Sequence, residues 1–198
     1  MKRLCALLLC GILLIPQLSA PAAAFWPTRA DEAVAWGEEM SISQEFLDQP
    51  GAVVTRGMAA QLLYEAAGRP EVSGTCPFSD VSGAYADAIT WAAEQGYISG
   101  MGDGTYAPAR SVTRQAFAAI LWRQAGSPSV PAQDLSAFQD ADATADWARS
   151  PILWCLQTGI MMGRSADRLA PVGTLTVTEA LLMLARVQNL PDISGIRT

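Results

Sequence analysis

Residues 78–124 decide the fold, and they read FSDVSGAYADAITWAAEQGYISGMGDGTYAPARSVTRQAFAAILWRQ. Small and apolar residues recur at helical spacing over residues 84–95, and Gly96 provides a stop, so a first helix is predicted there. Thr113 is a typical N-cap for a second helix, and Gly126 stands where a C-terminal cap is expected. The glycine-rich loop between the two helices allows positive φ angles and close approach of the backbone to a partner.

The same pattern recurs before and after this stretch. A shift of 63 residues aligns it with a later copy without a gap, and a shift of 58 aligns its second helix with an earlier copy. The tryptophan of the earlier copy aligns at a shift of 55, so its loop is three residues shorter. A unit of this size cannot bury a core alone. The aligned sets include Trp36, Trp91 and Trp154; Thr55, Thr113 and Thr176; and Leu63, Leu121 and Leu184.

The repeats and the short linkers between them predict a mainly all-α fold. In this fold three helix–loop–helix repeats pack as one pseudo-threefold bundle. We expect a signal peptide at residues 1–24, followed by copy one at 25–72, copy two at 73–130 and copy three at 131–198. Copy one is degenerate, because SISQEFLDQPGA replaces its glycine-rich loop.

Copy two resembles the S-layer homology family. The family pattern is an opening F-x-D-V, a helix that ends in glycine, a G-x-x-D-G-T-F/Y-x-P loop and a helix start T-R-A-E. Copy three reopens the pattern with Phe138 and Asp140, whereas copy one has no such opening. The chain is therefore similar to three tandem S-layer homology modules after a signal peptide. The matching positions of copy two are Phe78, Asp80, Val81, Gly100, Asp103, Gly104, Thr105, Tyr106, Pro108, Thr113 and Arg114.

The N-terminal residues have the layout of an export signal. A basic pair at residues 2–3 precedes an apolar run at residues 4–15, and alanines 22–24 form a small-residue cleavage site. The apolar run is shorter than the roughly 20 residues of a membrane span, so we expect no transmembrane segment in the mature protein. A lipoprotein signal at Cys10 is the alternative, but the large leucine before it is unfavourable. The layout predicts a secreted protein.

Charge and composition argue against several classes of function. Loss of the basic pair reduces 13 basic residues to 11, against 19 acidic ones, so the mature net charge is −8. Such a protein is a poor candidate for binding nucleic acid, because that affinity comes chiefly from neutralising phosphates. The chain has no histidine, which removes histidine-based triads and the common zinc sites. We therefore expect no enzyme, no cofactor and no metal site.

Two groups of residues leave alternatives open. Asp140, Asp142 and Asp146 would in principle serve as paired carboxylates or open a calcium loop, but their spacing better fits an acidic helix entry. A disulfide between Cys76 and Cys155 is permitted by an exported location. Two thiols on different repeats also fit as buried small apolar groups, and we favour free thiols.

Comparison of the three copies shows that helix capping and the arginine of the helix-start motif are independent of each other. Copy three keeps the capping box as Thr176 and Glu179 but has Val177 in place of the arginine. Copies one and two have Arg56 and Arg114 but no glutamate. A cation at a helix N-terminus opposes the macrodipole, so an anionic ligand shared with free helix-start N–H groups and the loop would explain the arginine. The alternative is an ion pair with a nearby acid such as Asp80 or Asp103.

The resemblance implies a ligand and a location. Modules of this family bind secondary cell-wall polysaccharide non-covalently, often through acidic pyruvyl-ketal sugars, in grooves between repeats. The chain would thus be an anchor at the cell wall, its arginines holding the carboxylate, the loop backbone contacting the sugar and an aspartate accepting hydroxyl hydrogens. The ligand-binding residues that the resemblance implies are Arg56, Asp80, Gly100, Met101, Gly102 and Arg114.

The departures from the family pattern favour a second hypothesis. The degraded first loop and Val177 fit an envelope protein–protein interaction or assembly module that has lost sugar binding. Arg164, which aligns with Met101, is a candidate to compensate for Val177 in copy three, but we favour a solvated loop arginine. The three aligned tryptophans are expected in the core rather than stacked on sugar rings, whereas Trp122 and Trp147 have no aligned partner and are candidates for groove or surface aromatics.

Overall fold

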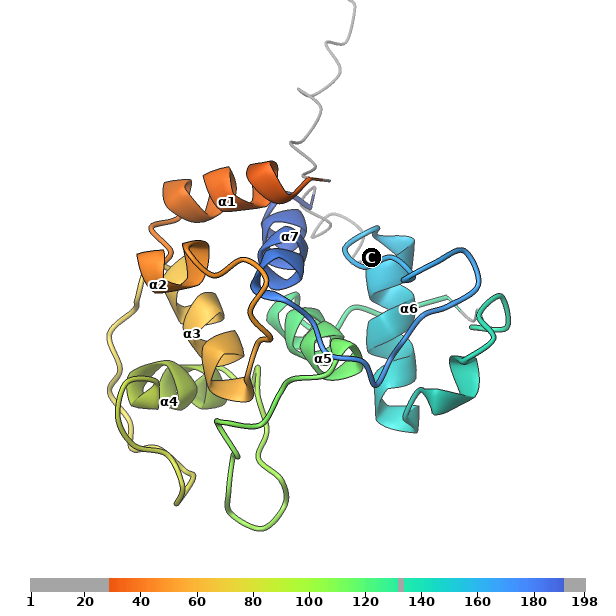
Figure 1. The fold of residues 1–198 in the computed structure, drawn as a ribbon. Coiled ribbons are helices and arrows are strands. Elements are labelled where there is room, and N and C mark those ends of the chain that lie inside the picture. The colour runs from red at the N-terminus through yellow and green to blue at the C-terminus, as the bar shows by residue number, and fades with distance from the viewer. Residues whose placement is uncertain (1–28, 132–133, 191–198) are drawn as a thin grey trace, which may run out of the picture.

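The computed structural model describes residues 29–131 and 134–190, which form helices and isolated β-bridges but no β-strand. The predicted all-α fold is confirmed, and the expected signal peptide lies outside the described residues. Figure 1 shows α3, α5 and α7 near the middle of the molecule, with α1, α4 and α6 around them. The elements are α1 (Ala30–Glu39), α2 (Gln44–Leu47), α3 (Arg56–Ala66), α4 (Ala86–Glu94), α5 (Arg114–Gln124), the 3-10 turns η1 (Ala141–Ala143) and η2 (Asp146–Ala148), α6 (Arg149–Gln157) and α7 (Val177–Gln188).

Each inner helix begins at an aligned threonine. The Oγ1 atoms of Thr55, Thr113 and Thr176 each accept a hydrogen bond from the backbone N–H three residues later. Copy three adds the predicted capping box, in which Glu179 accepts from the Thr176 N–H at 2.8 Å. The predicted helix starts are therefore confirmed, and an N-cap of this kind contributes about 1 kcal/mol to stability.

Each outer helix is followed by a residue in the left-handed region. The φ angles are 58° at Ser41, 72° at Gly96 and 71° at Gly159, so the serine of copy one adopts the conformation of the glycine that it replaces. Helix α4 starts two residues later than predicted. The reason is a turn at Gly83, which has a φ of 78° and accepts a hydrogen bond from the Ala86 N–H.

The copies interlock in a ring. The outer helix of each copy packs against the inner helix of the preceding copy: α4 on α3, α6 on α5, and α1 on α7, which closes the ring. The first two N–H groups of each inner helix also donate to carbonyls of a neighbouring copy. These pairs are Arg56 to Arg110, Gly57 to Pro108, Arg114 to Gly173, Gln115 to Pro171, Val177 to Ala52 and Thr178 to Pro50. The expected pseudo-threefold bundle is thus present in both helix packing and backbone contacts.

One hydrophobic core joins the three copies. The aligned leucines of α3, α5 and α7 are completely buried, and the aligned tryptophans of α1, α4 and α6 are at most 6% exposed, which confirms their expected place in the core. Cys76 and Cys155 are free thiols, as favoured from the sequence. Cys155 is buried, and burial raises the pKa of its thiol. None of the described helices combines the length and apolarity needed to cross a membrane.

Candidate functional site

The backbone N–H groups of the copy-two loop are held by the side chain of Asp80. Asp80 accepts hydrogen bonds from the Tyr106 N–H at 2.7 Å and the Ala107 N–H at 2.8 Å. The bond from Tyr106 is the main reason that the pKa of Asp80 lies below its ordinary value. Gly100 is required for close packing, because a Cβ there would lie 2.6 Å from the Thr105 carbonyl and 2.6 Å from the Phe78 ring. Gly102 at the exposed end of the loop has a φ of 93°.

Copy three repeats this arrangement at its own opening aspartate. Asp140 accepts from the Leu169 and Ala170 N–H groups, both at 2.8 Å. The bond from Leu169 is the main cause of a lowered pKa at Asp140. This aspartate therefore fixes a loop, and none of the described residues forms a cluster of three or more metal-ligating side chains.

Arg56 reaches from α3 into the loop of copy two. Its Nε donates to the Tyr106 carbonyl at 2.7 Å and its Nη2 to the Ser99 carbonyl at 2.9 Å. The guanidinium carbon also lies 4.3 Å from the centre of the Tyr106 ring, a cation–π distance. Arg56 thus joins copy one to copy two while keeping its charge near the loop.

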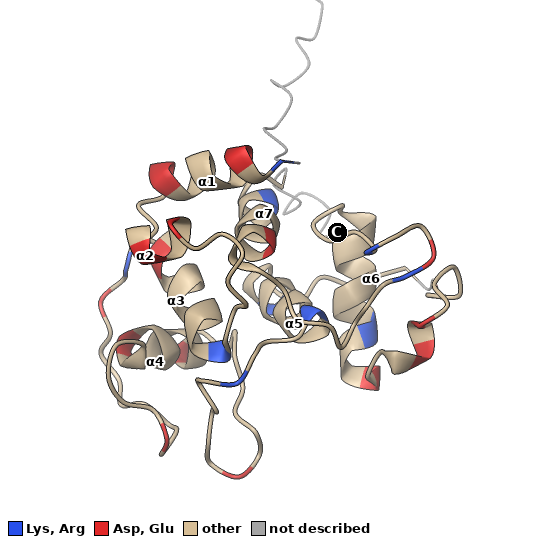
Figure 2. Cartoon of the chain, in the orientation of Figure 1, with Lys and Arg blue, Asp and Glu red and all other residues tan. Residues whose placement is uncertain are grey.

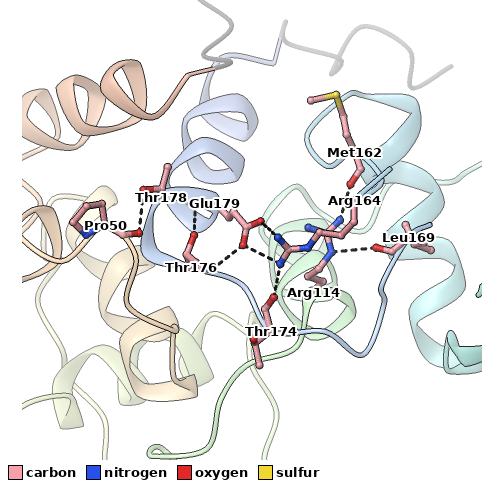
Figure 3. A network of polar contacts seen from close by, with 9 residues as sticks. All are labelled: Pro50, Arg114, Met162, Arg164, Leu169, Thr174, Thr176, Thr178 and Glu179. Carbon is pink, nitrogen blue, oxygen red and sulfur yellow. Dashed lines mark hydrogen bonds and ion pairs between the residues drawn. The ribbon is translucent and has the colours of Figure 1, made fainter. Parts of the chain in front are cut away.

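Arg114 makes the same contacts one copy further along. Its Nε donates to the Leu169 carbonyl at 3.2 Å and its Nη2 to the Met162 carbonyl at 2.6 Å, as Figure 3 shows. The side chain is only 5% exposed, and burial, followed by the nearby Arg164, lowers the pKa of the guanidinium. The hydrogen bonds of Arg114 therefore hold the loop of copy three.

Two expectations about the helix starts are wrong. Neither Arg56 nor Arg114 forms an ion pair with Asp80 or Asp103 within the described part of the chain, because both arginines donate to backbone carbonyls. The helix-start N–H groups are not free either. In α5 the first two donate to Gly173 and Pro171 of copy three, and the third donates to the Thr113 side chain.

A groove of about 490 Å³ lies beside the loop of copy two. We call it the arginine groove. Its walls come from all three copies: Arg56 from copy one, the loop and α5 from copy two, and Trp147 from copy three. It is lined by Arg56, Ile98, Ser99, Gly100, Met101, Tyr106, Arg110, Ser111, Val112, Thr113, Gln115, Ala116, Ala119, Ile120, Arg123 and Trp147.

The lining of the arginine groove is basic although the whole chain has a net charge of −6. It contains three arginines and no acidic residue. The Arg123 guanidinium donates to the Tyr97 carbonyl at 3.1 Å, and partial burial lowers its pKa. The exposed Arg110 guanidinium makes no hydrogen bond or ion pair with any described residue. In Figure 2 acidic segments lie mainly on the outer helices and the loops.

Trp147 forms an aromatic wall of the arginine groove. It belongs to η2, which packs against α5 and α6, and its side chain is 57% exposed. The side chain of Gln115 accepts the Ala145 N–H at 3.0 Å and so ties the chain before η2 to α5. The other unaligned tryptophan, Trp122, is half-buried and donates from its indole nitrogen to the Pro128 carbonyl. Of the two tryptophans without an aligned partner, Trp147 is therefore the groove aromatic and Trp122 is not.

The corresponding residues of copy three pair with each other. Arg164, which aligns with Met101, lies 2.5 Å from the carboxylate of Glu179, which aligns with Ala116, and also donates to the Thr174 carbonyl. Figure 3 shows this ion pair between the copy-three loop and the start of α7. An anion that approached Arg164 would meet a carboxylate already paired with it.

The helix start that contacts the shortened loop of copy one has no arginine. It is Val177 of copy three, which is fully buried and whose N–H donates to the Ala52 carbonyl. The shortened loop is held instead by Glu65, which is 2% exposed and accepts hydrogen bonds from the backbone and side chain of Ser43. Burial raises the pKa of Glu65, but its hydrogen bonds with Ser43, Gln61 and Arg69 together outweigh that effect and leave its pKa lowered.

The structure brings together three of the six residues expected at a ligand site. Arg56, Gly100 and Met101 line the arginine groove, whereas Asp80, Gly102 and Arg114 lie outside its lining. Sequence reasoning missed Arg110 and Arg123, and it did not decide whether Trp147 lies in a groove or elsewhere on the surface. A signal for Arg123 was present, because it recurs as Arg186 in copy three.

Comparison with known proteins supports the resemblance over part of the chain. Residues 77–118 and 137–176 match the S-layer homology domain. Copies two and three thus each contain a matched S-layer homology segment. Copy one lies outside both matches, and only its aligned positions and the ring of contacts described above relate it to the other two copies.

Two surface proteins are similar to the chain over most of its length. An S-layer protein of Bacillus thuringiensis subsp. finitimus is 26% identical over 150 residues, which cover 71% of this chain and 17% of that protein. Cell surface glycoprotein 1 of Acetivibrio thermocellus is 25% identical over 159 residues, which cover 74% of this chain and 7% of that protein. The chain spans less than a fifth of the length of these relatives.

Proposed function

We propose that the chain is a non-covalent cell-surface anchor that binds secondary cell-wall polysaccharide in the arginine groove. The matched S-layer homology segments and the two surface-protein relatives support a role at the cell surface. In this proposal the protein is secreted, residues 25–72 act as a first module, and the protein catalyses no reaction. The bound sugar is acidic, as a pyruvylated residue would be.

The observation that carries the proposal is the charge of the groove. Three arginines with no acidic residue beside them occur in a chain with a net charge of −6. Two of them, Arg56 and Arg123, already donate to loop carbonyls and are held in place, whereas Arg110 makes no contact of this kind with the described residues. A planar guanidinium offers paired donors to a carboxylate, so Arg110 is the arginine best placed to bind an acidic sugar.

The other ligand residues expected from the sequence take different parts in the proposal. Arg56, Gly100 and Met101 contribute groove surface. Asp80 and Arg114 act by holding loops of copies two and three, because their polar atoms are used in those contacts. Gly102 supports the turn at the exposed end of the copy-two loop.

The test is sedimentation of the purified protein with Gram-positive cell walls, before and after chemical removal of the secondary polysaccharide. We expect binding to intact walls and loss of binding to stripped walls. Arg110→Ala should lower the affinity about tenfold to a hundredfold, which is the effect of losing one charge-assisted contact of about 1.5–3 kcal/mol. Arg110→Lys should recover part of the loss, because lysine keeps the charge but not the planar donor pair.

Arg168→Ala is the matched control. Arg168 is an exposed arginine of the copy-three loop outside the groove lining, so its removal changes the net charge equally and should leave binding unchanged. Equal sedimentation of the parent with intact and stripped walls would favour the protein-interaction hypothesis. Full binding by Arg110→Ala would mean that the polymer binds elsewhere on the chain.

A further inference from the structure

We infer that Trp147 is a stacking platform for a sugar ring, so that the arginine groove binds an acidic polysaccharide at two adjacent points. The carboxylate of the ligand meets the arginines, and the apolar face of a pyranose ring lies on the indole. The inference rests on the proposed function and adds a second determinant to it.

The exposure of Trp147 is the first argument. Its side chain is 57% exposed, whereas Trp36, Trp91 and Trp154 are at most 6% exposed and Trp122 is half-buried. A tryptophan carries more apolar surface than most side chains, so covering Trp147 would remove a large apolar area from water. Because Trp147 also lines the basic groove, a ligand in that groove would cover it.

The second argument is that the platform is held in position before any ligand arrives. Ala148, the next residue, is fully buried, and Gln115 holds Ala145 on the other side of Trp147 through a 3.0 Å hydrogen bond. The tryptophan therefore extends from an anchored turn, and little conformational freedom remains to be lost on binding. Gln115 acts here as a positioning residue.

The third argument is the chemistry of the groove surface. The lining of the groove also includes the apolar residues Ile98, Val112 and Ile120. One side of a pyranose ring carries C–H groups and fits such a surface, while its carboxylate substituent fits a guanidinium. A peptide in extended form would also need backbone partners, but the first three N–H groups of α5 are already bonded. The groove therefore offers side chains, which favours an acidic sugar over an extended peptide.

The test compares Trp147→Phe and Trp147→Leu by calorimetric titration with purified secondary wall polysaccharide. Leucine keeps an apolar side chain without a ring, and we expect it to lower the affinity about tenfold, which corresponds to ~1.4 kcal/mol. Phenylalanine keeps a smaller ring, so Trp147→Phe should lower the affinity less than Trp147→Leu does. Met162→Ala is the matched control, because Met162 is 59% exposed on copy three but lies outside the groove lining.

A spectroscopic measurement checks the contact itself. The polysaccharide should shield the parent protein from acrylamide quenching of tryptophan fluorescence, and the shielding should be absent in Trp147→Phe. If Trp147→Leu binds as the parent does, or if the bound polymer leaves quenching unchanged, the platform is wrong while anchoring through Arg110 stands. Failure of the parent to bind any wall polysaccharide would sink the proposed function instead. Binding of an acidic peptide with the same dependence on Trp147, and no binding of polysaccharide, would replace the sugar with a protein partner.

Discussion

Copies two and three use the same framework but leave different surfaces beside their loops. In both, an aspartate fixes the loop and an arginine from the preceding copy donates to two loop carbonyls. Beside the copy-two loop the surface is an open basic groove. Beside the copy-three loop, Glu179 and Arg164 form an ion pair with each other.

The comparison separates what builds a loop from what would bind a ligand. The two arginine contacts are alike, so these contacts alone do not make an anion site. The surfaces differ because Ala116 and Met101 of copy two correspond to Glu179 and Arg164 of copy three, and Arg110 corresponds to a glycine. We therefore assign the proposed binding to the copy-two groove and a structural role to Arg114.

The largest expected effect concerns stability. Arg114→Ala removes a buried guanidinium and leaves the Leu169 and Met162 carbonyls without their donor. We expect a loss of about 2–4 kcal/mol in the free energy of unfolding, because leaving buried polar groups unpaired adds to the loss of charged hydrogen bonds. Urea unfolding followed by circular dichroism measures this loss.

Arg56→Ala is the matched variant, since Arg56 makes the same two kinds of contact from a half-exposed position. Water can replace the lost donors there, so we expect about half the loss of stability. A folded Arg114→Ala should still bind wall polysaccharide, whereas Arg56→Ala should bind it more weakly. If Arg114→Ala weakened binding and Arg56→Ala did not, Arg114 would belong to the ligand site after all.

A substitution that makes the copy-two groove resemble copy three should weaken binding while improving stability. Ala116→Glu places a glutamate at the third position of α5, where Thr113 supplies the other half of a capping box. The new carboxylate would also face the groove arginines. We expect a gain of roughly 0.5 kcal/mol in stability and about a tenfold loss of affinity for acidic polysaccharide, measured by thermal melting and calorimetric titration.

Met58→Glu is the control for this variant. Met58 occupies the same position of α3, after the N-cap Thr55, but it does not line the arginine groove. The substitution adds the same charge and the same capping partner, so it should affect stability in a similar way and leave the affinity unchanged. An equal loss of affinity in both variants would mean that net charge, and no specific groove, governs binding.

The sequence alone predicted the framework well. Threonine N-caps, the glycine stops and the buried leucine and tryptophan sets are local or periodic signals, and each was read from spacing. The repeated pattern also predicted the packed pseudo-threefold bundle. Local signals suffice for these features because each depends on residues within one helix turn or on one helical face.

The site was predicted only in part, because it depends on contacts between copies. Arg56 belongs to copy one in sequence but to the copy-two loop in space, through hydrogen bonds that span 50 and 43 residues. Arg110 has no arginine at the aligned position of copy three, so comparison of the copies gave no signal for it. The role of Trp147 depends on the approach of η2 to α5, which no local pattern encodes.

The smallest effect tests the framework that the two copies share. Hydrogen bonds from loop N–H groups lower the pKa values of Asp80 and Asp140 below the ordinary 3.8. A lowered pKa in the folded state means that each aspartate contributes stability above pH 3.8, and that this contribution is lost as the pH falls through the lowered value. Thermal melting from pH 7 to pH 2 should therefore show a decline that begins near pH 4.

Asp80→Asn and Asp140→Asn should lower the melting temperature at pH 7 by similar small amounts, because an amide cannot accept both loop N–H groups equally well. Between pH 4 and pH 2 the melting temperature of each variant should fall less than that of the parent, so that the curves converge in acid. Asp142→Asn is the control: its side chain is exposed and makes no hydrogen bond with the described residues, so its curve should follow the parent. An Asp80→Asn curve that follows the parent at every pH would show that the copy-two loop does not depend on this carboxylate. If only Asp140→Asn changed the melting curve, the aspartates of copies two and three would not have the same role.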